Sequence, residues 1–344
     1  MATTFGNRIN RARQILADKG WAGLLIGPGP ELAYFTGRDI FSHERLTCLV
    51  ITAEETHLIA PSTDEPGGWC DGEDAHRLAV DKLPKGDVGL GSGFTTAHVL
   101  RFQELIDGST HLLPEEIMSV KERGEIGELA RAGAAIDRVH AQVPELLQAG
   151  VTEEEVAKRL DELILHEHAE VDFVIVGSGP NGANPHHSHS ERVLQPGDPV
   201  VVDIGGTLDS GYHSDSTRTY VVPGGEPPAD FLKAFDAVAE GFRAACNLVR
   251  PGVTAGQLDE AARSVIEKAG FGEYFTHRLG HGIGLAGHER PWIVGNNDTV
   301  IEENMTFSIE PGVYVPGKWG IRIEDIVVVR GSGAETFNHR PHEL

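Results

Sequence analysis

Short apolar runs alternate with amphipathic stretches through the first third of the chain. Residues 7–19 show helical spacing, and the apolar runs AGLLIG, TCLVIT and THLIAP follow at residues 22–27, 47–52 and 56–61. Between the first two runs, GPGPELAYFTGR at residues 27–38 is rich in glycine and proline, which favours a loop. This alternation predicts a small α/β domain.

A long amphipathic helix is predicted after this region. Ile126, Leu129, Ala132, Ile136 and Val139 recur at helical spacing within residues 112–150. Pro114 and two acidic residues come just before this stretch. We therefore predict an N-terminal domain of residues 1–115 and a larger domain of residues 116–344.

The larger domain contains an internal repeat. QAGVTEEEVAKRLDELILHEHA at residues 148–169 resembles RPGVTAGQLDEAARSVIEKAGF at 250–271, and in each a Gly-Val-Thr sequence can cap an amphipathic helix. Each helix is followed by an acid beside glycine, at Asp203 and Glu310. A second acid follows at Asp215 and Glu324, after 12 and 14 residues. The repeat predicts two related α/β halves that face one another, with the acids at their shared axis.

Composition excludes some partners. The 344 residues are 40% hydrophobic and 24% charged, and the formal net charge is −23. Such an acidic chain is unsuited to nucleic acid or to an anionic membrane surface, since both are bound through basic patches. Three widely spaced cysteines without metal-ligand spacing indicate reduced thiols. With no signal-like or 18-residue apolar segment, we expect a soluble, cytoplasmic protein.

Five residues of the second half are candidate metal ligands: Asp203, Asp215, His281, Glu310 and Glu324. Several of the acids lie inside or beside β-branched apolar runs, where an ionised carboxylate is costly unless it is paired or metal-bound. Four carboxylates and one imidazole can hold two divalent cations about 3.5 to 4 Å apart. Cysteine is absent from these stretches, which favours manganese, with cobalt, iron or zinc as alternatives. Two such ions sharing a bridging water predict metal-assisted hydrolysis.

Histidines gather near the same segments. His186, His187 and His189 lie in NPHHSHS, His277 precedes His281, and His288 follows it. Any one of them alone is equally explained as a surface or core histidine, and the HHSHS segment as a polar loop. His288, beside a glutamate and just before Arg-Pro, is placed to donate to an oxyanion. GLGSG at residues 89–93 and GSGPNG at 177–182 lack the full dinucleotide-binding pattern and are predicted to be turns.

The motifs together resemble a known family. NPHHSHS, VVVDIGG, SDSTRTY, HRLGHGIGL, HERP, FSIEPGVY and GIRIEDIVVV, with AYFTGR and VKERGEI before them, are similar to the pita-bread metallopeptidases. The resemblance is to the branch of proline dipeptidase (prolidase) and Xaa-Pro aminopeptidase, and is closest to small actinobacterial dipeptidases. It implies an α+β pita-bread catalytic domain with pseudo-twofold α/β halves, preceded by a smaller creatinase-type α/β domain.

The resemblance also implies residue roles. Asp203 would bind one metal, His281 and Glu310 the other, and Asp215 and Glu324 would bridge both. Glu310 would serve as general base and pass its proton toward the leaving proline nitrogen. His288 would stabilise the tetrahedral intermediate, and His186 and His277 would bind the proline side of the substrate. Arg322 would either orient the carboxylates that bind metal or bind a carboxylate of the substrate.

One departure from the family pattern is visible. The two aspartates are usually eleven positions apart, whereas Asp203 and Asp215 are separated by twelve. The extra residue falls within TLDSGYH, where it most simply lengthens a hairpin turn. Asp209 in this turn is an alternative ligand.

The resemblance predicts hydrolysis of the bond before proline in Xaa-Pro dipeptides, with two divalent ions per chain, most simply Mn²⁺, and a homodimer. The sequence leaves Xaa-Pro aminopeptidase activity on longer peptides open as an alternative. The N-terminal domain and NPHHSHS argue against methionine aminopeptidase. Because all five ligands are present, metal-free creatinase-like chemistry and a non-catalytic peptide-binding protein are the weaker alternatives.

Overall fold

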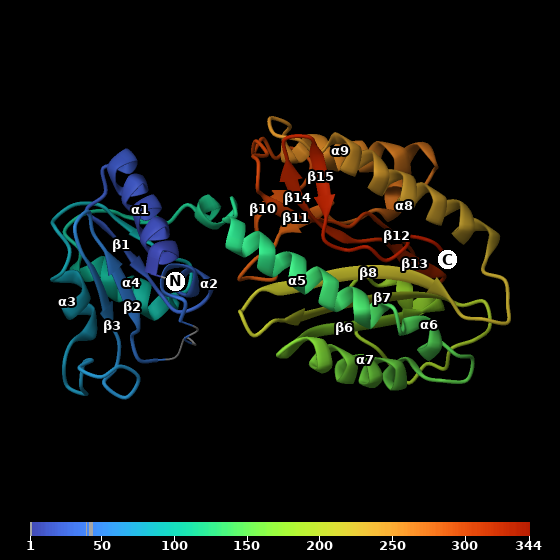
Figure 1. The fold of residues 1–344 in the computed structure, drawn as a ribbon, viewed down its shortest axis with the longest axis horizontal. Coiled ribbons are helices and arrows are strands. Elements are labelled where there is room, and N and C mark those ends of the chain that lie inside the picture. Colours follow the sequence, from blue (N-terminus) through green and yellow to red (C-terminus); the bar gives the residue numbers. More distant parts are fainter. Residues whose placement is uncertain (1, 39, 41–43) are drawn as a thin grey trace. The chain divides into compact units, whose positions relative to one another are not determined.

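The computed structural model describes residues 2–38, 40 and 44–344 and divides into two compact units, residues 1–118 and 119–344 (Figure 1). The boundary predicted from the sequence lies after residue 115. Among the described residues, no helix has both the length and the apolar character needed to cross a membrane.

The first unit is built on a five-stranded mixed sheet of order β3-β2-β1-β4-β5. Its strands are β1 (Gly23–Ile26), β2 (Cys48–Ile51), β3 (Thr56–Ile59), β4 (Val88–Leu90) and β5 (Thr110–Leu112). Its helices are α1 (Ala2–Lys19), α2 (Pro30–Thr36), α3 (Ala75–Val80) and α4 (Thr96–Leu105). The α/β pattern is as predicted, but the loop predicted at residues 27–38 is wrong in part, because α2 begins there at Pro30. The helix α1 also begins earlier than the predicted start at Asn7, and the residues ahead of Asn7 show no clear apolar periodicity from which the sequence could predict this.

The first half of the second unit consists of α5 (Arg123–His140), α6 (Val143–Leu146), α7 (Glu153–Glu167) and an antiparallel sheet of order β6-β7-β8. Its strands are β6 (Glu170–Ser178), β7 (Pro199–Thr207) and β8 (His213–Val221). Apolar side chains such as Leu160, Ile164 and Val202 are fully buried between α7 and this sheet. Each such side chain contributes about 1.5–3 kcal/mol when it leaves water.

The second half begins with α8 (Ala229–Leu248) and α9 (Ala255–Lys268). Its sheet has the order β10-β9-β11-β14-β15, from β9 (Gly280–Gly282), β10 (Glu289–Ile293), β11 (Thr306–Ile309), β14 (Asp325–Arg330) and β15 (Gly333–Thr336). A hairpin of β12 (Gly312–Val315) and β13 (Trp319–Arg322) extends from it. Short 3-10 helices lie at η1 (Glu115–Met118), η2 (Gly179–Ala183) and η3 (Gly272–Tyr274). In Figure 1 the sheets of the second unit lie between α7 on one side and α8 and α9 on the other.

The repeat predicted from the sequence is present in the second unit. Thr152 and Thr254 are the N-caps of α7 and α9, and each hydroxyl accepts a backbone N–H three residues later within a capping box. Each cap also forms a β-bridge, Thr152 with Val193 and Thr254 with Val300. Val193 and Val300 are 107 positions apart, as are Asp203 and Glu310. The two halves therefore carry their acids at matching places.

The two threonine caps predict a measurable loss of stability on substitution. Thr152→Ala and Thr254→Ala should each lower the free energy of unfolding by about 1 kcal/mol, because an N–H at the start of the helix loses its acceptor. Thr→Ser at the same positions keeps the hydroxyl and should stay close to wild type. Urea unfolding followed by circular dichroism measures this; alanine variants as stable as the serine variants would contradict it.

Candidate metal centre

The register of β7 and β8 places two acids on one face of the first sheet. Asp203 pairs with Thr217, and Gly205 pairs with Asp215. Residues two apart on a strand face the same side, so Asp203 and Asp215 are diagonal neighbours on one face. Thr217 lies on that face as well.

The turn between these strands is formed by the TLDSGYH segment, to which the extra residue was assigned from the sequence. Leu208 and Tyr212 close the turn through a 2.9 Å backbone hydrogen bond. Asp209, within it, forms a 2.7 Å ion pair with Arg131, and its side chain is 75% exposed. Asp209 is not among the residues that line the cavity described below.

The second pair of acids comes from a long hairpin in the other half. Ile309 pairs with Asp325 and Gly312 pairs with Arg322, so Glu310 and Glu324 stand opposite one another where the hairpin pairing is interrupted. The backbone N–H of Glu324 donates to the carbonyl oxygen of Thr217 over 3.1 Å. This bond ties the second pair of acids to the strand that carries the first.

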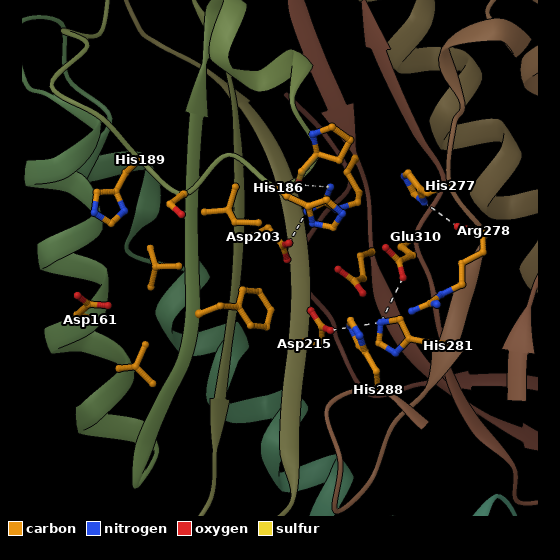
Figure 2. A pocket seen from close by; sticks show the side chains of 18 residues that line it. Asp161, His186, His189, Asp203, Asp215, His277, Arg278, His281, His288 and Glu310 are labelled. Atoms are coloured by element: carbon orange, nitrogen blue, oxygen red, sulfur yellow. Dashed lines mark hydrogen bonds and ion pairs between the residues drawn. The ribbon is translucent and has the colours of Figure 1, made fainter. Parts of the chain in front are cut away.

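The structure brings all five predicted ligands together. Three overlapping groups of residues each have ligand atoms that lie within 4.8 Å of one another. The groups are Asp203, Asp215 and Glu324; His281, Glu310 and Glu324; and Asp215, His281 and His288. Figure 2 shows Asp203 and Asp215 from one half and His281, His288 and Glu310 from the other pointing toward one another.

The imidazole of His281 is oriented for coordination. Its Nδ1 lies 3.0 Å from the carbonyl oxygen of Gly282, which fixes the proton on that nitrogen. The free Nε2 lies 3.3 Å from Glu310 Oε1 and 3.6 Å from Asp215 Oδ2. Burial lowers the pKa of His281 to about 3, so the ring is neutral, as a metal ligand requires.

The cluster concentrates negative charge in a buried place. Burial first, and then neighbouring carboxylates, raise the pKa values of Asp215 and Glu324 well above the usual range. Burial likewise raises the pKa of Glu310 to about 7. Arg322 supplies a buried positive charge: it is ion-paired with Asp203 and donates from Nε to Thr217 Oγ1 over 3.0 Å.

This donor set fits divalent cations. One oxygen of Glu324, Oε1, is buried and has no hydrogen-bond partner among the described residues, although its other oxygen lies 2.7 Å from Thr217 Oγ1. An unpartnered buried carboxylate oxygen that faces other carboxylates calls for a cation. The predicted ligands could therefore hold one or two metal ions.

His288 lies directly against the cluster. Its ring centroid is 3.9 Å from that of His281, and burial lowers its pKa, so it is a neutral N–H donor at neutral pH. The adjacent Glu289 forms a buried ion pair with Lys121, and Ser119 donates to the carbonyl oxygen of Arg290 over 3.0 Å. These contacts hold the segment that carries His288. The motifs contained Lys121 and Glu289, but no sequence signal paired residues so far apart.

The other predicted site residues have different surroundings. His277 donates from Nδ1 to the carbonyl oxygen of Arg278 over 2.7 Å, and its Nε2 lies 3.1 Å from the hydroxyl of Tyr314. Burial and the charge of Arg322 lower the pKa of His277 to about 4. Arg322 completes the chain by donating to the same hydroxyl over 2.7 Å. Tyr314 was not predicted, although it ends the FSIEPGVY motif.

A cavity of about 1000 Å³ opens onto the cluster. His186, His277, Arg278 and Arg322 line it beside the ligands, and Phe173 and Ile175 of β6 add apolar wall. His189 also lines it, together with Asp161, across β6 from the acids (Figure 2). His187 points elsewhere, since its Nε2 lies 2.9 Å from Glu153 Oε2. Arg278 lies within the HRLGHGIGL motif but was given no role there, and Phe173 and Ile175 had no signal in the sequence.

Known families and relatives match nearly the whole chain. The chain matches the model of metallopeptidase family M24 over residues 127–331 and that of the creatinase/prolidase N-terminal domain over residues 8–67. It is 47% identical over 365 residues to the "Probable dipeptidase PepE" of Mycobacterium tuberculosis, covering 100% of this chain and 96% of that protein. It is 35% identical over 365 residues to the "Xaa-Pro dipeptidase" of Lactobacillus helveticus, covering 98% of each.

A solved structure extends the comparison to the fold. The crystal structure of dipeptidase PepE from Mycobacterium ulcerans matches with a TM-score of 0.93 at 45% identity, covering 99% of this chain and 97% of that one. The predicted resemblance and the pita-bread fold class are thus confirmed. The chain belongs to metallopeptidase family M24, with a creatinase-type N-terminal domain ahead of its pita-bread domain.

Proposed function

We propose that this chain hydrolyses the peptide bond before proline in Xaa-Pro dipeptides with the help of two divalent metal ions. The observation that carries the proposal is the buried cluster of four carboxylates and one neutral imidazole, open to a cavity lined by further histidines. The similarity to a relative named Xaa-Pro dipeptidase supports the choice of substrate.

The ligand assignment divides the five residues between the two ions. Asp203 would hold one ion, His281 and Glu310 would hold the other, and Asp215 and Glu324 would be shared by both. When bound, the two ions would supply an activated hydroxide and polarise the carbonyl of the scissile bond. We favour manganese, because oxygen ligands dominate the set.

Two residues of the chain handle the proton and the developing charge. Glu310 lines the cavity and lies beside His281, where it can accept a proton and pass it to the leaving proline nitrogen. His288 lies on the Asp215 and His281 side of the cluster, and its neutral ring can donate to the tetrahedral oxyanion.

We assign the proline side of the substrate to His186 and His277, which line the same cavity. Of the two roles open to Arg322, its contacts favour the one that orients the site. Its guanidinium is already engaged by Asp203, Thr217 and Tyr314, so it orients a metal ligand rather than receiving a substrate carboxylate.

The apolar wall suggests which residue precedes proline. Ile175 pairs directly with Asp203 across β6 and β7, and Phe173 pairs with Gly205, so both side chains lie on the face of the acids. An apolar side chain next to the scissile bond would cover them. We therefore propose substrates such as Leu-Pro. From the resemblance to proline dipeptidases we also propose a homodimer, and we propose the cytoplasmic location that the sequence led us to expect.

The substrate proposal predicts a clear preference by length. With manganese added, Leu-Pro should be hydrolysed at least about 10-fold more efficiently, in kcat/KM, than Leu-Pro-Gly, because a dipeptidase pocket is closed beyond the proline. Release of free leucine, measured by chromatography, is the readout. Cleavage of the tripeptide alone would establish the aminopeptidase alternative instead. Hydrolysis of neither, by protein that retains metal, would favour the non-catalytic alternative.

Substitutions should separate the metal ligands from the oxyanion donor. Asp215→Ala and Glu324→Ala remove a ligand shared by both ions, so metal content and activity should both collapse. His288→Ala should keep two metals per chain and lower kcat by about 10²- to 10³-fold, the usual effect of losing one oxyanion donor. Metal analysis beside steady-state kinetics checks this. Two retained metals and normal turnover in Asp215→Ala would refute the ligand assignment.

Metal removal should have an effect that depends on pH. Carboxylates with raised pKa values bind protons more tightly in the folded chain, so the metal-free protein should lose stability as pH rises from about 4.5 toward the pKa of about 7 at Glu310. Bound cations relieve this repulsion. Manganese at 100 times its Kd should add about 2.7 kcal/mol at pH 8 and much less at pH 5, where protons compete. Thermal unfolding at pH 5 and pH 8, with manganese or with a chelator, measures the stability of the metal-bound and metal-free protein. Equal stabilisation by manganese at the two pH values would contradict the prediction.

A further inference from the structure

A fully buried carboxylate lies at the start of α7, outside the cavity. Both Glu153 oxygens are engaged: the backbone N–H and hydroxyl of Ser178 donate to Oε1 over 2.7 and 2.6 Å, and Ser190 donates to Oε2 over 2.7 Å. Asn181 Nδ2 lies 3.1 and 3.0 Å from the two oxygens, and His187 Nε2 lies 2.9 Å from Oε2. One carboxylate thus gathers donors from both ends of residues 178–190.

This segment carries His186 into the cavity. The backbone N–H groups of His186 and His187 donate to Asn184, to its side-chain oxygen and its carbonyl oxygen respectively, over 3.1 Å each. The segment returns to β6 through a 2.7 Å bond from the N–H of Val176 to the carbonyl oxygen of Ser188. His186 lines the cavity, whereas its neighbour His187 is held by Glu153. The position of His186 therefore depends on a charge that does not face the cavity.

The other half has a comparable arrangement on α9. The side chain of Asp259 is 1% exposed, accepts the backbone N–H of Leu279 over 3.0 Å, and is bound by Arg263 through two bonds of 2.7 and 2.9 Å. Arg263 also donates to the carbonyl oxygens of Phe275 and His277 over 2.8 and 2.9 Å. These bonds fix the segment that carries His277.

The two carboxylates are related through the internal repeat but are not strict equivalents. Glu153 directly follows the cap Thr152, whereas Asp259 lies five residues after the cap Thr254, one helical turn further along. Neither Glu153 nor Asp259 lines the cavity beside the metal cluster. Structural support is the simpler explanation for a buried carboxylate. Glu153 and Asp259 share a further feature: each anchors a segment that carries a histidine into the cavity.

We propose that Glu153 and Asp259 are positioning residues for substrate binding, each acting through one histidine, Glu153 through His186 and Asp259 through His277. The proposal rests on the proposed function, since it takes these two histidines as the grip on the proline end. If an amide replaced either carboxylate, its NH2 group would face N–H and O–H groups that now donate to the carboxylate. These hydrogen bonds would be lost, and the segment would no longer be held in place. Leu279, which Asp259 holds, lies two residues from His281, but the metal ligands are also held by the strand pairing of β7 with β8, β9 with β10 and β11 with β14, so metal content should be retained.

The single variants test where the effect falls. Glu153→Gln and Asp259→Asn should each raise KM for Leu-Pro by about 10-fold, since a small displacement of a binding group is enough for this. The value of kcat should stay within about threefold, and metal content should be unchanged. Glu154→Gln and Glu260→Gln are matched controls, because these exposed acids adjoin the buried ones. The controls should have wild-type KM.

Double substitutions test through which histidine each carboxylate acts. Adding Glu153→Gln to His186→Ala should raise KM little further, whereas adding it to His277→Ala should give the product of the single effects. Asp259→Asn should show the opposite pattern. Lower thermal stability with wild-type KM, or multiplicative effects in every pair, would overturn the proposal. Wild-type protein that binds metal but leaves Leu-Pro intact would instead refute the proposed function, so the two failures are distinguishable.

Discussion

Mutual repulsion among four closely spaced carboxylates, three of them buried and Glu310 partly so, is the constraint on which the second unit depends. Ionised acids at this depth are unfavourable unless cations or donors offset their charge. Arg322 offsets part of it through Asp203, and Thr217 contacts both Asp203 and Glu324, at 2.8 and 2.7 Å. One guanidinium cannot neutralise four carboxylates. The negative charge that Arg322 leaves uncompensated, together with burial, raises the pKa values of Asp215, Glu310 and Glu324. Bound metal ions would compensate this charge.

Holding these acids together requires that the two halves be joined next to them. Arg218, on β8, is ion-paired with Asp325 of β14 at 2.7 Å and donates to the carbonyl oxygen of Glu324 at 2.7 Å. Thr219 Oγ1 donates to the carbonyl oxygen of Arg322 and accepts its backbone N–H, at 2.9 and 3.0 Å. On the second half, these bonds are made by Glu324 itself and by Arg322 and Asp325, which are two and one positions from it. The contacts that join the two halves therefore also hold the candidate metal ligands in place.

Several of the candidate ligands were predictable from the sequence, because acids such as Asp203 and Glu324 lie inside or beside apolar strands, where burial of a carboxylate is costly. The repeat was equally visible, since Thr152 and Thr254 stand in matching capping sequences. The ion pair of Lys121 with Glu289 and the bond between His187 and Glu153 were not predictable, since they join residues 168 and 34 positions apart. The residue pattern by itself could not tell that His186 faces the cavity while His187 turns away, because that depends on loop backbone conformation; only the family resemblance singled out His186.

The candidate metal ligands and the proposed substrate-binding histidines are held in place in different ways. Asp203 and Asp215 stand on paired strands, and Glu310 and Glu324 flank a hairpin, so backbone register fixes their spacing. His186 and His277 stand on irregular segments, where no ladder sets their position and buried side chains must do so instead. Changes in these segments could alter which substrate is gripped while the register of the acids stays intact. A fold that keeps its hydrolytic centre on strands and its recognition on loops can change specificity without rebuilding its metal site.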